Sequence, residues 1–71
     1  MPIIRVDLIA GRDLQTKQEL IRRLTEATSD VLSVPADRIR VLIAEIPAGQ
    51  WGVGGVTLDR GETRTPAAQH P

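Results

Sequence analysis

The sequence lacks several residue types on which small proteins often rely for stability or ligand binding. Its 71 residues include no cysteine, no phenylalanine and no tyrosine, with one tryptophan and one histidine. The absence of cysteine excludes disulfides, and a lone His70 argues against a structural metal site. Nine basic and nine acidic side chains cancel, and no Phe or Tyr is present to stack on bases. These features argue against a nucleic-acid partner.

The short length limits the core that one chain can form. A chain of this size buries only about 60% of its unfolded surface, so its own core is marginal. Because disulfides are excluded and a structural metal is not expected, oligomerisation remains as the source of further stability, and we expect a homo-oligomer. The first apolar run is interrupted by Arg5 and Asp7, which does not fit a signal peptide or a spanning helix. We therefore expect a soluble cytoplasmic protein with no membrane partner.

Alternating and helical hydrophobic periods predict a strand, a helix and a second strand. Residues 4–8 alternate between apolar and charged side chains, which is the period of a half-buried strand. Asp13 is well placed as the N-cap of a helix that starts at Leu14. Apolar residues then recur on one helical face, at Leu20, Ile21, Leu24, Ala27, Val31 and Leu32. Residues 33–37, with Pro35, stop the helix, and residues 39–46 form a nearly continuous apolar run that predicts a largely buried strand.

This order predicts an α/β fold built on a β-α-β subunit, with two parallel strands and a right-handed crossover. A glycine-rich loop follows at 48–55, and Val56–Leu58 predict a short strand or the arm of a C-terminal hairpin. We expect one domain over 2–58 and a mobile tail over 59–71. Two strands and one helix leave one face of the sheet uncovered, so subunits are expected to assemble into oligomeric sheets.

Pro2 is the most informative single residue. If Met1 is removed, Pro2 becomes a free secondary amine, and α-amino groups titrate at about 7.7–8.0, near the pH at which a general base works best. The alternative is that Pro2 only begins the first strand, where a missing N–H is harmless.

Three further side chains are candidates for ligand binding, each with a structural alternative. Arg12 follows Gly11 at the end of the first strand and is either a carboxylate clamp or a solvated turn residue. Arg40 lies in an apolar strand and needs an anion, either a structural partner such as Glu45 or Asp7, or a bound acid. Trp51 lines a ligand pocket or fills a gap between subunits, and these two roles are compatible.

Known catalytic sets of other kinds are missing from the sequence. Cysteine is absent and the lone histidine is in the tail, so no Ser/His/Asp or Cys/His set is available. An amine base, cationic clamps and an apolar wall remain, which are the groups needed to abstract a proton beside a carbonyl and to hold the resulting enolate.

In these features the chain resembles the 4-oxalocrotonate tautomerase family over about residues 2–55. The resemblance rests on Pro2-Ile3-Ile4, Leu8-Ile9-Ala10-Gly11-Arg12, Lys17-Gln18-Glu19-Leu20-Ile21-Arg22, Ile39-Arg40-Val41 followed by Glu45, and Trp51-Gly52-Val53-Gly54-Gly55. Each motif is weak alone, but their order and spacing together are specific.

The resemblance implies a β-α-β subunit in a homohexamer whose sites are shared between chains. Pro2 is then the general base that moves a proton in a 2-hydroxydienoate or another enol acid, giving the conjugated 2-oxo acid. Arg40 stabilises the developing enolate, Arg12 holds a distal carboxylate, and the backbone amide of Leu8 assists the oxyanion. Trp51 supplies the apolar wall. The resemblance implies no metal or organic cofactor, a small unsaturated carboxylate as the substrate, and a role such as aromatic catabolism.

Two departures from the family pattern and two alternatives stay open. Tryptophan stands at position 51 where the family usually has phenylalanine, and the residues beyond Leu58 do not match the family's short basic ending. One alternative is a catalytically idle oligomer that binds small acids. The other is a pathway-specific isomerase or a hydratase of the same superfamily; a hydratase is disfavoured because Ile9 and Val53 occupy the positions of its water-activating residues.

Overall fold

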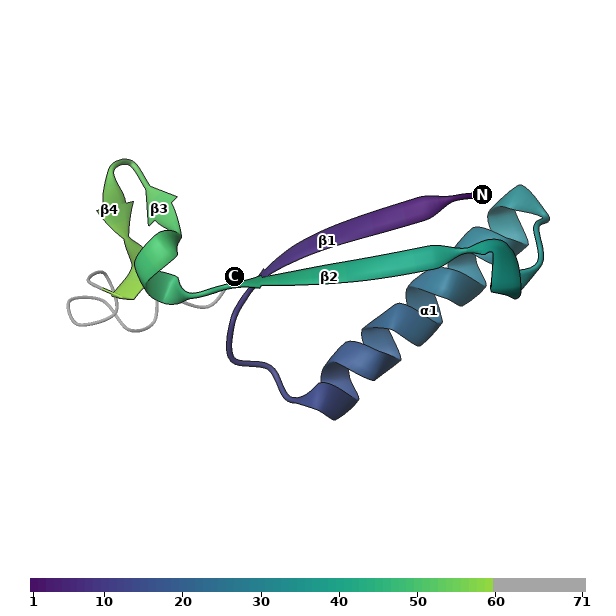
Figure 1. The fold of residues 1–71 in the computed structure, drawn as a ribbon, viewed down its shortest axis with the longest axis horizontal. Coiled ribbons are helices and arrows are strands. Elements are labelled where there is room, and N and C mark those ends of the chain that lie inside the picture. Colours follow the sequence, from purple (N-terminus) through teal and green to yellow (C-terminus); the bar gives the residue numbers. More distant parts are fainter. Residues whose placement is uncertain (60–71) are drawn as a thin grey trace.

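A computed structural model of the chain describes residues 1–59 and has the predicted β-α-β order. Strand β1 (Ile3–Ile9) leads through a turn to helix α1 (Leu14–Leu32), and strand β2 (Arg40–Ile46) follows a short 3-10 turn, η1 (Ala36–Arg38). β1 and β2 are parallel, with Ile3 opposite Arg40 and Ile9 opposite Ile46. Figure 1 shows α1 lying along one side of this two-stranded sheet. The predicted fold class is therefore confirmed.

The C-terminal part of the described chain forms the predicted hairpin. A second 3-10 turn, η2 (Ala48–Gln50), precedes strands β3 (Gly52–Val53) and β4 (Val56–Thr57), which pair antiparallel. Gly54 and Gly55 form the turn with φ of 62° and 85°, a left-handed conformation that favours glycine. In Figure 1 the hairpin projects beyond the ends of β1 and β2. Apart from Asp59, the predicted tail 59–71 lies outside the described residues, so the domain limits stay a prediction.

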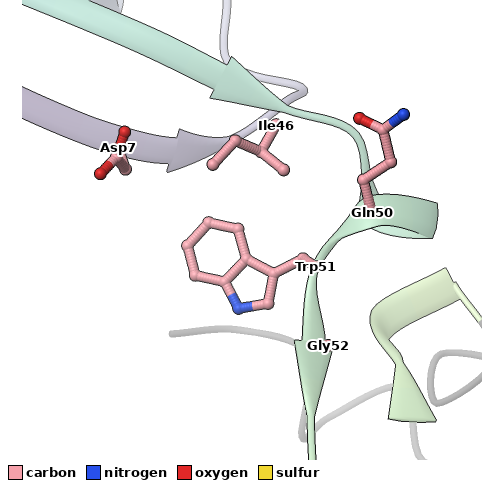
Figure 2. A pocket seen from close by; sticks show the side chains of 5 residues that line it. All are labelled: Asp7, Ile46, Gln50, Trp51 and Gly52. Carbon is pink, nitrogen blue, oxygen red and sulfur yellow. The ribbon is translucent and has the colours of Figure 1, made fainter. Parts of the chain in front are cut away.

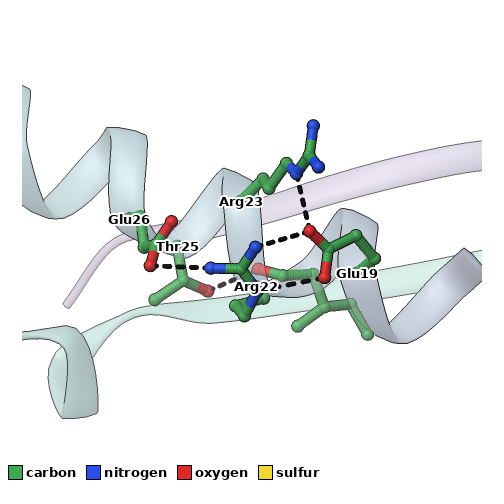
Figure 3. A network of polar contacts seen from close by, with 6 residues as sticks. Glu19, Arg22, Arg23, Thr25 and Glu26 are labelled. Carbon is green, nitrogen blue, oxygen red and sulfur yellow. Dashed lines mark hydrogen bonds and ion pairs between the residues drawn. The ribbon is translucent and has the colours of Figure 1, made fainter. Parts of the chain in front are cut away.

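Local side-chain contacts explain where the helix begins and ends. Asp13 is the N-cap, and its Oδ1 accepts a hydrogen bond of 2.8 Å from the backbone N–H of Thr16. Ser33 closes the helix in the left-handed conformation, with φ of 55°. The exposed face of α1 carries an ion-pair network in which Arg22 Nη1 lies 2.9 Å from Glu26 and Arg23 Nε lies 2.7 Å from Glu19 (Figure 3). No helix among residues 1–59 is long and apolar enough to cross a membrane.

The described residues, 1–59, cover only one face of the sheet. Alternate residues of β1, namely Ile4, Val6 and Leu8, lie on the helix side and are half-buried, whereas Ile3 on the other side is 53% exposed. Among residues 1–59, Ile39 is the only buried hydrophobic residue. The prediction of a largely buried β2 is therefore wrong for one chain: Leu42 is 46% exposed because no layer formed by residues 1–59 covers that side. We call this side of the sheet the open face.

The helix also leaves apolar surface uncovered. Leu20 and Leu24 are half-buried as expected, but Val31 and Leu32, predicted on the same face, are 80% and 54% exposed. The radius of gyration is 15.4 Å, against roughly 11 Å for a compact domain of this length. An elongated chain with one buried hydrophobic residue in its described part lacks the core that an independent domain needs.

Candidate active site

The amino-terminal ends of both strands bring Pro2 and Arg40 together. In a parallel pair these ends lie at the same edge of the sheet, and the backbone N–H of Arg40 donates to the Pro2 carbonyl at 3.0 Å. Pro2 is half-buried, whereas Met1 before it is 75% exposed. The strand register thus places a guanidinium-bearing residue beside Pro2. We call this edge the amino end of the sheet.

Arg40 does not contact either of the structural partners that the sequence suggested. Its side chain is exposed, and Nη1 donates to the backbone carbonyl of Asp37 at 3.2 Å. Glu45 lies on the helix side of β2 and pairs with Lys17 instead. Asp7 shares the open face but lies opposite Ala44, four residues along the strand and so about 13 Å away. Within residues 1–59 the guanidinium has no carboxylate partner, which keeps a bound acid as its candidate anion.

The opposite edge of the sheet, which we call the carboxyl end, carries Arg12. Ala10 continues the ladder after β1 ends, since its backbone N–H donates to the Ile46 carbonyl at 2.9 Å. Gly11 then takes a φ of 137°, which a residue with a side chain rarely adopts, and turns the chain toward the helix. Arg12 is exposed between this glycine and the helix cap at Asp13. Its side chain is therefore carried on a tight turn between β1 and α1.

Trp51 also lies at the carboxyl end, beside a hollow on the open face. The hollow measures about 340 Å³ and is lined by Asp7, Ile46, Gln50, Trp51 and Gly52. Figure 2 shows the indole ring facing Ile46 and Asp7 across this space. Trp51 is half-buried and borders open space, which suits both roles considered for it. Sequence reasoning missed Asp7 as a lining residue, although the strand alternation places it on the same side of β1 as the exposed residues Ile3 and Arg5, which is the open face.

One chain does not bring the predicted residues into a single site. Pro2 and Arg40 lie at the amino end, and Arg12 and Trp51 lie at the carboxyl end. β1 has seven residues, so the two ends are about 20 Å apart at 3.3 Å per residue. A small substrate cannot touch both ends of the same chain.

The hydrogen-bond alternation decides which backbone amides of β1 point away from β2. We call this unpaired side of β1 its open edge. In a parallel ladder every second residue of a strand directs its N–H to the neighbouring strand. Ala10 donates to Ile46, so the amide of Leu8, two residues earlier, is also directed at β2. The intervening amide of Ile9 is directed at the open edge. The resemblance pointed to the Leu8 amide; the ladder leaves the Ile9 amide available to a ligand.

Two carboxylates next to the Arg12 turn have lowered pKa values. A hydrogen bond from Lys17 lowers the pKa of Glu45, and a hydrogen bond from the backbone amide of Gly11 lowers it further. Hydrogen bonds that Thr16 donates to the Asp13 carboxylate lower the pKa of Asp13. Among residues 1–59 no group of three or more His, Cys, Asp or Glu side chains is placed to hold a metal ion; His70 lies outside them.

Comparison with known proteins gives a consistent result. The model of the family described as "Tautomerase enzyme" matches residues 2–60. A probable tautomerase of Ralstonia nicotianae is 48% identical over 56 residues, 79% of this chain and 80% of that protein. A 2-hydroxymuconate tautomerase of a Pseudomonas species is 44% identical over 55 residues, 78% of this chain and 87% of that protein. Among solved structures, a heterohexamer 4-oxalocrotonate tautomerase from Chloroflexus aurantiacus superposes with a TM-score of 0.78 at 34% identity, covering 83% of this chain and 95% of that one.

Proposed function

This chain belongs to the tautomerase family and is a tautomerase, and from that premise we propose that it converts small 2-hydroxydienoates or related enol acids into conjugated 2-oxo acids without a cofactor. The name of the Pseudomonas relative, a 2-hydroxymuconate tautomerase, supports this substrate class. The observation that carries the proposal is the backbone hydrogen bond from Arg40 to Pro2, because it places an arginine beside the residue whose nitrogen is the proposed base.

Pro2 acts as the base once Met1 has been removed. With Met1 in place the Pro2 nitrogen is part of an amide and accepts no proton at neutral pH; after its removal the nitrogen is a secondary amine. The amine takes the proton of the 2-hydroxyl group, the oxygen becomes a carbonyl, and the double bonds shift along the diene. The same amine then returns a proton to a diene carbon, so the reaction is a net isomerisation.

Two groups stabilise the charge that develops on the substrate oxygen. The Arg40 guanidinium binds the 2-oxygen and the adjacent carboxylate, and a backbone amide at the carboxyl end of β1 donates to the oxyanion. We assign this amide to Ile9 in place of Leu8, because the ladder directs the Ile9 amide to the open edge. Arg12 holds the distal carboxylate of a diacid, and Trp51 forms the apolar wall that keeps the amine neutral.

The site is shared between copies of the chain in a homo-oligomer, which we propose is a hexamer. Three features support this assembly. The open face is exposed, the described part of the chain has a single buried hydrophobic residue, and the amino and carboxyl ends of the sheet lie about 20 Å apart. Two chains related by a two-fold axis, with their β1 edges antiparallel, bring the amino end of one sheet to the carboxyl end of the other. The heterohexamer named for the Chloroflexus relative supports the subunit number.

An assay of two forms of the N-terminus tests the proposal. Protein with Met1 removed, verified by mass spectrometry, is assayed by ultraviolet absorbance on a panel of 2-hydroxydienoates beside protein that retains an extra residue before Pro2. We expect turnover by the first form and background activity in the second, with the same oligomer size. Pro2→Ala keeps a less rigid primary amine and is expected to lose about one to three orders of magnitude. Full activity with Met1 intact would refute the base, and diacid binding without turnover would indicate an idle binding protein.

A further inference from the structure

The turn that carries Arg12 is held on both sides by backbone and side-chain hydrogen bonds. Before it, Ala10 donates to the Ile46 carbonyl at 2.9 Å and fixes the chain to β2. After it, Asp13 accepts from the Thr16 amide at 2.8 Å through its side chain and from the Lys17 amide at 3.2 Å through its carbonyl. Arg12 is thus exposed, but the backbone that carries it is tied to the sheet and to the first turn of the helix.

One ion pair joins strand β2 to helix α1 close to this turn. Lys17 Nζ lies 2.8 Å from Glu45 Oε1, and the two side chains are only 21% and 35% exposed. Glu45 stands opposite Leu8 in the strand register, near the end of β2 that lies beside the Arg12 turn. The ion pair therefore ties β2, which Ala10 also contacts before the turn, to the first helical turn directly after Arg12. The other ion pairs within residues 1–59 join side chains along α1 alone.

We propose that Glu45 and Lys17 are positioning residues that fix the direction of the Arg12 guanidinium toward the distal carboxylate of the substrate. This inference rests on the proposed function of Arg12. A clamp on an otherwise exposed turn binds a diacid well only if its backbone is held in the binding geometry, because small displacements of positioned groups weaken binding and catalysis. Neither residue touches the reacting atoms. Their effect is therefore confined to substrates that use Arg12.

Substitutions that keep the side-chain volume separate this role from simple stability. Glu45→Gln keeps a side chain of nearly the same shape but loses the charge that pairs with Lys17, and Lys17→Met keeps the stem without the ammonium. Each is expected to raise KM for a diacid about tenfold while kcat and the KM for a monoacid stay within about twofold. Glu26→Gln is the matched control, since it breaks an ion pair on the exposed face of α1 and is expected to change neither KM.

A double-mutant cycle and a charge exchange complete the test. Once Arg12→Ala is present, Glu45→Gln is expected to have no further effect on the diacid KM, because there is no guanidinium left to orient. The exchange of Lys17→Glu with Glu45→Lys is expected to recover part of the diacid affinity that either single change removes.

The failures of the two proposals are distinguishable. Wild-type protein that turns over no enol acid contradicts the proposed function. Turnover with a diacid KM that depends on Arg12 but is unaffected by Glu45→Gln overturns the positioning role alone. Equal losses on monoacids and diacids, or effects of Glu45→Gln and Arg12→Ala that add, also overturn it. Thermal melts of every variant, recorded beside the kinetics, show whether a loss follows unfolding.

Discussion

The two ends of the β1–β2 sheet are built by different means. At the amino end, strand register alone brings Pro2 and Arg40 together, through one backbone hydrogen bond of 3.0 Å. At the carboxyl end, the position of Arg12 depends on a glycine with positive φ, a helix cap and an ion pair. The backbone of a sheet is hard to shift, whereas a turn depends on each side chain that holds it. Proton transfer is assigned to the first end and substrate selection to the second.

Mixing two variants tests whether the two ends belong to one site. Protein with an extra residue before Pro2 and the Arg12→Ala variant are each expected to be nearly inactive on a low concentration of a diacid. A two-fold pair made of one chain of each kind holds one intact site and one doubly altered site. Refolding the two together in equal amounts is therefore expected to restore roughly a quarter of the wild-type rate. A mixture no more active than its components would show that both ends do not serve one site.

Arg40→Ala is expected to cause the largest loss among the arginine substitutions. Removing a cation that stabilises the oxyanion lowers kcat by about 10²–10³, which corresponds to roughly 2.7–4 kcal/mol. Because the 2-oxygen is common to all enol acids, monoacids and diacids are expected to lose the same factor. Steady-state kinetics on one substrate of each class measures this. A loss confined to KM would show that Arg40 contributes to substrate binding in the ground state and not to stabilisation of the transition state.

The elements that short-range patterns control are those that the sequence predicted correctly. The alternation over residues 4–8, the cap at Asp13, the stop near Pro35 and the glycine-rich hairpin each have a local physical cause, and the structure has all of them. The family was also recognisable, because the order of Pro2, the Gly11–Arg12 pair, Arg40 and Trp51 is specific even where each element alone is not.

Long-range placement was harder to predict. The burial of β2 was overestimated because an apolar strand does not reveal whether its own chain or another copy covers it, and Leu42 remains 46% exposed. The pairing of Glu45 with Lys17 rather than Arg40 depends on the side of β2 to which each residue points. The Leu8 amide points to β2 and the Ile9 amide points away from it. This difference follows from the strand register, which a sequence pattern does not contain.

Arg12→Ala is expected to discriminate between substrates, in contrast to Arg40→Ala. A lost charge-assisted hydrogen bond is worth about 1.5–3 kcal/mol, so KM for a diacid is expected to rise about 10- to 150-fold with little change in kcat. A monoacid has no distal carboxylate and is expected to keep its KM. Measuring both substrates on both arginine variants gives the comparison directly. Equal losses on both classes would make Arg12 a structural residue of the turn.

The smallest effect is expected at Glu19, which lies on the exposed face of α1 and in neither end of the sheet. Hydrogen bonds from Arg22, and then from Arg23, lower the pKa of Glu19 from 4.5 to about 2 (Figure 3). A carboxyl group with a lowered folded-state pKa stabilises the fold above its unfolded pKa and loses that effect as the pH falls through the folded value. Wild-type protein is therefore expected to melt slightly above Glu19→Gln at pH values higher than 4.5, with the difference closing near pH 2.

Salt and kinetics supply the controls for this last variant. Glu19 and Arg22 have side chains that are 43% and 54% exposed, so added salt is expected to shrink the difference in melting temperature by screening the charges. Rates on monoacids and diacids at neutral pH are expected to match those of the wild type. A melting difference that is the same at pH 2 and pH 7 would assign the effect to packing rather than charge. A changed diacid KM would show that selection by Arg12 extends along α1 beyond the turn that carries it.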